Sequence, residues 1–285
     1  MKRDDYNTTQ KCTWCPGCCN VAIWDILKQV LLEAAIEPKD VVIVYDIGCS
    51  GNGANFTDVY AFHGLHGRAL PVAQGVKLTN PNLKVIVMGG DGDGLGIGVG
   101  HFIHACRRNI DITYVIHDNQ IYGLTAGQVS PRSDLGIITK TSPYGNIEPP
   151  VNPIALSLTS GASFVSRAFS GNPRHLKDVL KKAILHKGFS VVDVLQPCIT
   201  FNKTNTYAWF NSRVYYLENN SNYDRKDFNT ALNKSFEWGE KIPMGIFYEK
   251  ESPTYEDKLN IRLDLSIKQD NSAIDVSNLL QEYEV

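Results

Sequence analysis

The chain contains seven cysteines, and their positions are the first sign of chemistry in its sequence. They are Cys12, Cys15, Cys18, Cys19, Cys49, Cys106 and Cys198. Four lie close to the N-terminus, whereas Cys49 and Cys198 follow short apolar runs typical of buried strands. An odd number of cysteines, clustered in a chain without an apolar leader, favours free, catalytic or metal-bound thiols over disulfides. Four thiolates, gathered from one loop and from distant strand ends, would suit an iron–sulfur cluster.

Two features of the cysteine set allow other interpretations. The C-x2-C-x2-C spacing that starts at Cys12 also suits a zinc ribbon, so a zinc-binding interaction protein stays an alternative. Cys106 lies within a predicted helix, where we expect it to act as a small buried apolar side chain.

A second group of candidate residues follows two of the predicted strands. The strand over 84–90 runs into Gly-Asp-Gly, and the next strand ends at Asp118 and Asn119. Asp91 and Asn119 therefore lie at the carboxyl ends of parallel strands, where open α/β sheets bind ligands. A carboxylate and an amide oxygen suit Mg²⁺, with a diphosphate completing the coordination. The glycines let the backbone approach phosphate groups near a helix N-terminus.

Alternating strands and helices must position these residues. Short apolar runs rich in β-branched residues predict buried strands, and apolar residues at helical spacing predict helices. The predicted strands are 40–48, 84–90, 111–118, 162–168 and 189–197; the predicted helices are 20–35, 173–188 and one that a glycine-rich turn opens within 92–108. This alternation predicts an α/β fold with a parallel sheet and helices on both faces.

The pattern weakens after about residue 204. We expect an α/β domain over residues 1–203 and a C-terminal extension over 204–285 that packs on a partner subunit. Residues 243–255 are interpreted as an extended arm, and residues 266–285 as a short helix with a loose tail.

Composition excludes several classes of partner. The formal net charge is −2, so no basic field points to nucleic acid. No stretch approaches the ~20 apolar residues of a membrane span. The N-terminal residues lack the apolar core of a secretory signal, so we expect a cytoplasmic protein.

Seven segments of the chain form a specific combination. They are WCPGC (14–18), IGCS (47–50), HGLHGRA (63–69), GDGDGLGIG (90–98), DNQIYGLT (118–125), QPCITFN (196–202) and GIFY (245–248). Together they resemble the β subunit of the thiamine diphosphate-dependent 2-oxoacid:ferredoxin oxidoreductases, in the short, separately encoded form common in archaea. The resemblance implies a thiamine diphosphate-binding, pyrophosphate-type domain that also carries a [4Fe–4S] cluster.

The resemblance also implies roles for individual residues. The side chains of Asp91 and Asn119 and the backbone carbonyl of Ile121 would hold Mg²⁺. The cluster ligands would be Cys15, Cys18, Cys49 and Cys198. The other cofactor contacts would come from Ile47, Gly48, Cys49, Ser50, His66, Gly92, Asp93, Gly123, Leu124 and Thr125.

Two residues depart from the family pattern. Cys19 stands where the family has glycine, and a Cβ there would cost ~1 kcal/mol if the position needs a positive φ; we interpret Cys19 as a spectator thiol. Asp118 stands where the family has asparagine, next to the metal-binding position. The roles of Cys12, His63 and Arg68 stay open. Structural roles are expected for His101, His104, His117, His175 and His186.

The implied reaction is the coenzyme A-dependent oxidative decarboxylation of a 2-oxoacid, such as pyruvate or 2-oxoglutarate, to acyl-CoA and CO₂. Electrons would pass through the [4Fe–4S] cluster to ferredoxin. The general acid/base glutamate is expected on a partner α (or fused γα) subunit. The preferred 2-oxoacid and the assembly beyond a heterodimer stay open. Two alternatives are half of a non-redox thiamine diphosphate synthase or decarboxylase, and an iron–sulfur scaffold subunit.

Overall fold

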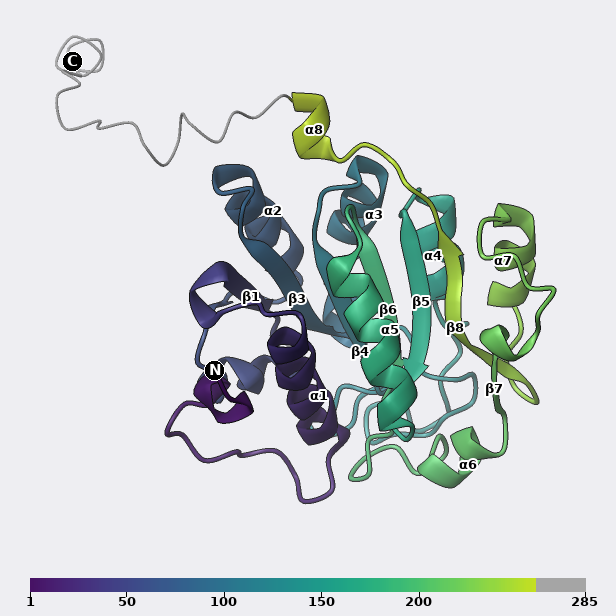
Figure 1. Ribbon diagram of the computed structural model, residues 1–285. Helices are drawn as coiled ribbons and strands as arrows, with labels where there is room; N and C mark the ends of the chain where they lie inside the picture. The colour runs from purple at the N-terminus through teal and green to yellow at the C-terminus, as the bar shows by residue number, and fades with distance from the viewer. Residues whose placement is uncertain (260–285) are drawn as a thin grey trace, which may run out of the picture.

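A single mixed sheet organises the protein (Figure 1). The computed structural model describes residues 1–259 of the 285. In this part of the chain the strand order is β2-β1-β3-β4-β6-β5-β8-β7. The strands are β1 (Val41–Tyr45), β2 (Tyr60–His63), β3 (Lys84–Gly90), β4 (Thr113–Asp118), β5 (Phe164–Phe169), β6 (Ser190–Leu195), β7 (Val214–Tyr216) and β8 (Ile242–Glu249). The first six strands are parallel, and β8 joins β5 in antiparallel orientation.

Helices cover both faces of the sheet. The α-helices are α1 (Cys19–Glu33), α2 (Ala69–Thr79), α3 (Val99–Arg108), α4 (Pro153–Thr159), α5 (Pro173–Leu185), α6 (Tyr207–Asn211), α7 (Phe228–Ser235) and α8 (Tyr255–Leu259). Apolar residues of α1 and α5 pack on one face, and those of α2, α3 and α4 pack on the other. The predicted α/β fold with helices on both faces is therefore confirmed.

Alternation along the strands explains the two layers. In β1 every residue is buried, and Val42 and Val44 face the α2–α3 layer while Val41 and Ile43 face the α1–α5 layer. Strands covered on both faces need continuous apolar runs, which is the pattern that the sequence shows.

Helix starts follow ordinary capping chemistry. The side chains of Asn152 and Asn172 accept hydrogen bonds from backbone N–H groups in the first turns of α4 and α5. Each of these helices has proline at its first position, where a backbone N–H would have no hydrogen-bond partner within the helix, so its absence costs nothing.

Short helical turns connect several of these elements. They are the 3₁₀ turns η1 (Arg3–Tyr6), η2 (Pro38–Asp40), η3 (Ser50–Asn55) and η5 (Leu217–Asn219), and the π-helical turn η4 (Asp93–Ile97). Because η4 ends at Ile97 and is capped by Gly98, regular α3 starts at Val99, within the segment 92–108 where a glycine-rich turn was predicted to open a helix.

The C-terminal third is part of the sheet as far as it is described. Residues 242–249 form β8, so the segment interpreted as an arm is largely a sheet strand, and that interpretation was wrong for these residues. Ile242 and Met244 pack against Phe210 of α6 in a small third core. Packing of this region on a partner stays a prediction, and the predicted helix and tail over 266–285 lie outside the described residues.

Within residues 1–259, no helix combines the length and the apolar character that a membrane crossing requires.

Candidate cofactor site and thiol cluster

A cavity of about 240 Å³ opens at the carboxyl ends of β1, β3 and β4. Its lining includes every candidate cofactor and Mg²⁺ residue, namely Ile47, Gly48, Cys49, Ser50, His66, Asp91, Gly92, Asp93, Asn119, Ile121, Gly123, Leu124 and Thr125. The parallel strands bring these segments together because their carboxyl ends share one edge of the sheet. Their individual roles stay predictions.

Asp91 and Asn119 form the candidate metal end of the cavity. Asp91 is 1% exposed, and its Oδ2 accepts a hydrogen bond from the hydroxyl of Ser130. Burial raises the pKa of Asp91 to about 6, although the Ser130 hydrogen bond and the charge of Arg132 oppose this rise. The Asn119 Oδ1 accepts from the Ile121 backbone N–H at 3.0 Å. A buried carboxylate beside an amide oxygen fits a hard cation, which would stabilise the ionised form.

Asp93 ties three segments of the cavity wall together. Its Oδ1 accepts from the backbone N–H of Gly67 at 2.7 Å and of Ile47 at 3.4 Å, and it pairs with His66 Nδ1 at 2.9 Å. Because the Asp93 side chain is engaged within the protein, its predicted contact with the diphosphate would have to come from the backbone.

Close packing surrounds Gly92. A Cβ at this position would overlap with the ring of Tyr122, whose hydroxyl donates to the Gly92 carbonyl at 2.7 Å. Only glycine leaves room for the Tyr122 ring here.

Asp46 is a buried carboxylate that the sequence did not indicate. It accepts hydrogen bonds from Ser50 Oγ at 2.8 Å and from the backbone N–H of Gly90. Burial and the nearby Asp93 raise its pKa to about 8. Its position at the end of β1, directly before Ile47, is the signal that could have identified it.

His117, for which a structural role was predicted, is buried in β4 and also lines the cavity. Its Nδ1 lies 2.8 Å from Asn20 Oδ1 and 2.9 Å from Gln196 Oε1. Burial lowers its pKa to about 4, so the imidazole is neutral at pH 7. Asn20 and Gln196 were likewise missed, because their contact with β4 is purely tertiary.

The four candidate cluster thiols lie beside one another. The thiol of Cys18 interacts electrostatically with Cys15 and Cys49, and the thiol of Cys49 with Cys15 and Cys198. Burial is the main reason why the pKa of Cys18 rises to about 12 and that of Cys49 to about 11. A bound metal would lower the pKa of these thiols instead, because metals bind the thiolate form.

Gly123 connects the thiols to the cavity. A Cβ on Gly123 would lie 3.4 Å from Cys49 Sγ and 3.7 Å from Cys198 Sγ. Among the described residues, no three His, Cys, Asp or Glu side chains converge closely enough to bind one metal ion. Each thiolate of a [4Fe–4S] cluster binds a different iron, so such convergence is not required.

Trp14 holds the N-terminal thiol segment in place. Its indole N–H donates to the Cys49 carbonyl at 2.5 Å, and its ring packs edge-on against Phe56 and Trp24 with centroid distances of 5.0 and 6.2 Å. No pattern in the sequence indicates this contact.

Cys19 and Cys106 are not among the four candidate ligands, although Cys19 lies next to Cys18 and near Cys198. Cys106 is fully buried in the core, as expected. Cys19 is the first residue of α1 and is not among the positive-φ residues, so the predicted backbone strain is absent. The turn before α1 instead places Gly17 at a φ of +78°. The Cys19 thiol donates to the Pro197 carbonyl at 3.2 Å and lies 2.7 Å from the Tyr207 hydroxyl.

Asp118 has a structural partner. It is fully buried, and its Oδ2 accepts from Arg132 Nε at 2.8 Å. Aspartate at position 118, in place of the family's asparagine, therefore forms a buried ion pair with Arg132.

The fold and the cavity define a thiamine diphosphate enzyme. Residues 46–194 match the family described as "Thiamine pyrophosphate enzyme, C-terminal TPP binding domain". Residues 198–262 match the family that covers the C-terminal region of the pyruvate ferredoxin oxidoreductase beta subunit.

Known proteins specify the class further. A 2-oxoacid:ferredoxin oxidoreductase subunit β from Saccharolobus solfataricus is 48% identical over 258 residues, which cover 86% of this chain and 85% of the relative. The subunit from Sulfolobus sp. is 46% identical over 264 residues, covering 88% and 87%. A solved structure, 2-oxoglutarate:ferredoxin oxidoreductase from Magnetococcus marinus with 2-oxoglutarate, coenzyme A and succinyl-CoA bound, superposes with a TM-score of 0.89. It has 37% sequence identity and covers 100% of this chain and 97% of its own.

The chain belongs to the β subunits of the 2-oxoacid:ferredoxin oxidoreductases, as its motifs predict.

Proposed function

We propose that the cavity binds thiamine diphosphate together with Mg²⁺, and that Cys15, Cys18, Cys49 and Cys198 ligate a [4Fe–4S] cluster. The observation that carries this proposal is the shared location of the candidates: all the predicted cofactor residues line one cavity, and Gly123 of that lining lies beside the thiols of Cys49 and Cys198. In the cell, the subunit would work in the cytoplasm with coenzyme A as acyl acceptor and ferredoxin as electron acceptor.

The residues have distinct tasks in this proposal. Asp91, Asn119 and the Ile121 carbonyl would hold the cation, whose charge would offset that of the diphosphate. When bound, thiamine diphosphate supplies the nucleophilic carbon and the electron sink for decarboxylation. Asp93 Oδ1 lies 2.9 Å from His66 Nδ1 and so holds this histidine at the cavity wall.

The cavity supports the need for a partner α subunit. No glutamate is among its lining residues within 1–259, and Asp46, Asp91 and Asp93 are already engaged with protein groups. The general acid/base glutamate would therefore come from the α subunit, across an interface that completes the site.

The test is anaerobic co-expression of this chain with its partner subunit. The purified complex should reduce ferredoxin or a viologen dye when it receives coenzyme A and one of a panel of 2-oxoacids, which also identifies the preferred substrate. The chain alone should not. Appreciable 2-oxoacid oxidation by the isolated chain would contradict the partner requirement.

Iron and sulfide analysis separates the redox function from its alternatives. A non-redox synthase or decarboxylase half needs no thiols beside Gly123, so a complex that contains thiamine diphosphate but no iron would favour that alternative. Iron without any affinity for thiamine diphosphate would favour a scaffold subunit.

A further inference from the structure

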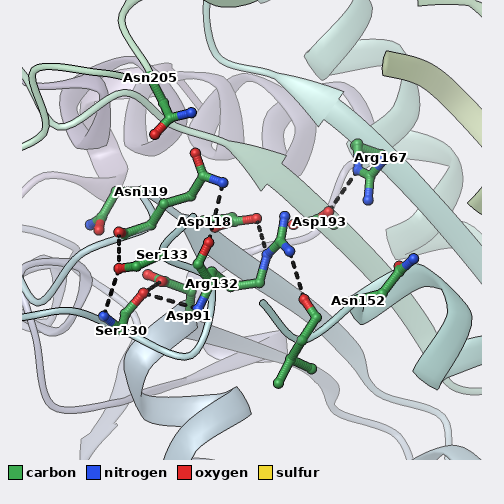
Figure 2. Close-up of polar contacts among 12 residues, drawn as sticks. Asp91, Asp118, Asn119, Ser130, Arg132, Ser133, Asn152, Arg167, Asp193 and Asn205 are labelled. Carbon is green, nitrogen blue, oxygen red and sulfur yellow. Dashed lines mark hydrogen bonds and ion pairs between the residues drawn. The ribbon is translucent and has the colours of Figure 1, made fainter. Parts of the chain in front are cut away.

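A loop that follows the DNQIYGLT segment along the chain supports the candidate metal site. Residues 128–133 fold back towards the carboxyl ends of β3 and β4, and a turn is closed by the Ser133 N–H donating to the Ser130 carbonyl at 3.0 Å. Figure 2 shows Ser130, Arg132 and Ser133 of this loop gathered beside Asp91 and Asp118.

Ser130 makes a directed contact with Asp91. The serine is 6% exposed and the aspartate 1% exposed, so water does not replace this contact freely. The Ser130 hydroxyl accepts from the Arg132 backbone N–H at 3.2 Å and donates to Asp91 Oδ2. Because a hydroxyl has a single proton, the backbone donor on its lone pair directs that proton to the carboxylate.

The loop is anchored on the strand that carries the second candidate ligand. Ser133 Oγ accepts from the Ser130 N–H at 2.8 Å and donates to the Gln120 carbonyl at 2.6 Å. Arg132 is buried, with its Nε on Asp118 Oδ2 at 2.8 Å and its Nη1 on the Val151 carbonyl at 2.6 Å. Residues 118 and 120 flank Asn119. The loop therefore connects Asp91 of the β3 end to the segment that presents Asn119.

We propose that Ser130 is a positioning residue of the Mg²⁺–diphosphate site: it fixes the rotation of the Asp91 carboxylate, and its loop holds the Asn119 segment in register with it. This inference rests on the proposed function, since it assumes that Asp91 and Asn119 bind the cation. Groups that orient metal ligands typically change metal affinity ~10- to 100-fold when they are removed. Ser130 is not among the residues that line the cavity, so we expect its effect on cofactor binding rather than on substrate contacts.

The test compares Ser130→Ala with Ser130→Thr in the full chain co-expressed with its partner. The Mg²⁺ concentration needed for half-maximal thiamine diphosphate binding, measured by calorimetry on the cofactor-free complex, should rise ~10- to 100-fold for Ser130→Ala. It should return towards the wild-type value for Ser130→Thr, which keeps the hydroxyl. Mn²⁺ as a probe in place of Mg²⁺ should show an altered paramagnetic resonance spectrum in the alanine variant.

Ser157→Ala is the matched control. Ser157 is a fully buried serine of α4 whose hydroxyl donates to the Pro153 carbonyl at 2.6 Å, away from the cavity. It should leave the Mg²⁺ requirement unchanged. If Ser130→Ala does not fold, Ser130→Cys keeps the volume while weakening the donor, and it should show the same rise.

The outcomes separate this inference from the proposed function. Wild-type complex that fails to bind thiamine diphosphate with Mg²⁺ would refute the proposed site itself. If the wild-type complex binds thiamine diphosphate and the Ser130→Ala complex binds it with the same Mg²⁺ requirement, the inference about Ser130 is wrong but the proposed site stands. A raised requirement in Ser157→Ala as well would also overturn it, because any lost buried hydroxyl would then have the effect.

Discussion

At the scale of single residues, Cys19 shows how a departure from a family pattern is accommodated. The position is helical and buried, so a side chain fits without strain. Since the thiol donates to the Pro197 carbonyl, the Tyr207 hydroxyl donates to the sulfur, and the residue joins α1 to the segment that precedes Cys198.

Cys19→Ala should therefore lower stability without removing iron. The lost hydrogen bond and buried sulfur together predict about 1–2 kcal/mol of lost unfolding free energy. Denaturant unfolding measures the loss, and iron and sulfide analysis of the anaerobic complex measures the cluster.

Cys198→Ser provides the comparison for that measurement. It should lose iron because it replaces a candidate ligand. If Cys19→Ala lost iron to the same extent, Cys19 would be a ligand and the proposed set of four would be wrong.

At the scale of elements, what could be predicted depends on where the apolar residues lie. Strands β1, β3, β4 and β6 have buried, nearly continuous apolar runs and were correctly predicted. All four residues of β2 are exposed, so its sequence shows no buried-strand pattern. Strand β8 pairs as an antiparallel strand beyond the parallel set, and its last two residues are only half-buried, so its sequence resembles an arm.

The same distinction applies to the candidate site. Asp91 and Asn119 could be found because each directly follows a strand. Ser130 and Arg132 could not, because the segment that contains them has no regular secondary structure and reaches the site through tertiary contacts alone.

The N-terminal thiol segment is an element without regular structure, and Trp14 is expected to control its docking. Trp14→Ala removes one hydrogen bond and two edge-on ring contacts, which together predict about 2 kcal/mol of lost docking free energy. The variant complex should lose iron faster on exposure to a chelator, as followed by absorbance, while its affinity for thiamine diphosphate stays near that of the wild type.

Trp14→Phe separates the two contributions. It keeps an aromatic ring against Phe56 but cannot donate to the Cys49 carbonyl, so its rate of iron loss should lie between those of wild type and Trp14→Ala. Equal rates for all three proteins would show that Trp14 does not hold the cluster segment.

At the scale of the whole molecule, the sheet gathers buried polar groups at one edge. Asp46, Asp91 and His117 come from three different strands or strand ends, and burial shifts the pKa of each towards the neutral form. Such shifts link folding stability to pH, because the unfolded chain titrates near the ordinary pKa values.

His117 makes this linkage testable. Its pKa falls from 6.5 to about 4 on burial, so the unfolded chain takes up a proton below pH 6.5 that the folded chain does not. The contribution of neutral His117 is therefore fully present above pH 6.5 and is lost as the pH falls towards 4, by about 3 kcal/mol in all. Denaturant unfolding of the cofactor-free chain between about pH 7.5 and pH 4.5, a window set around these pKa values, should show a shallower loss of stability for His117→Gln than for wild type.

His104→Gln, at an exposed position of α3, is the control and should keep the wild-type slope of stability against pH. Identical slopes for His117→Gln and wild type would show that His117 is not held neutral by the fold.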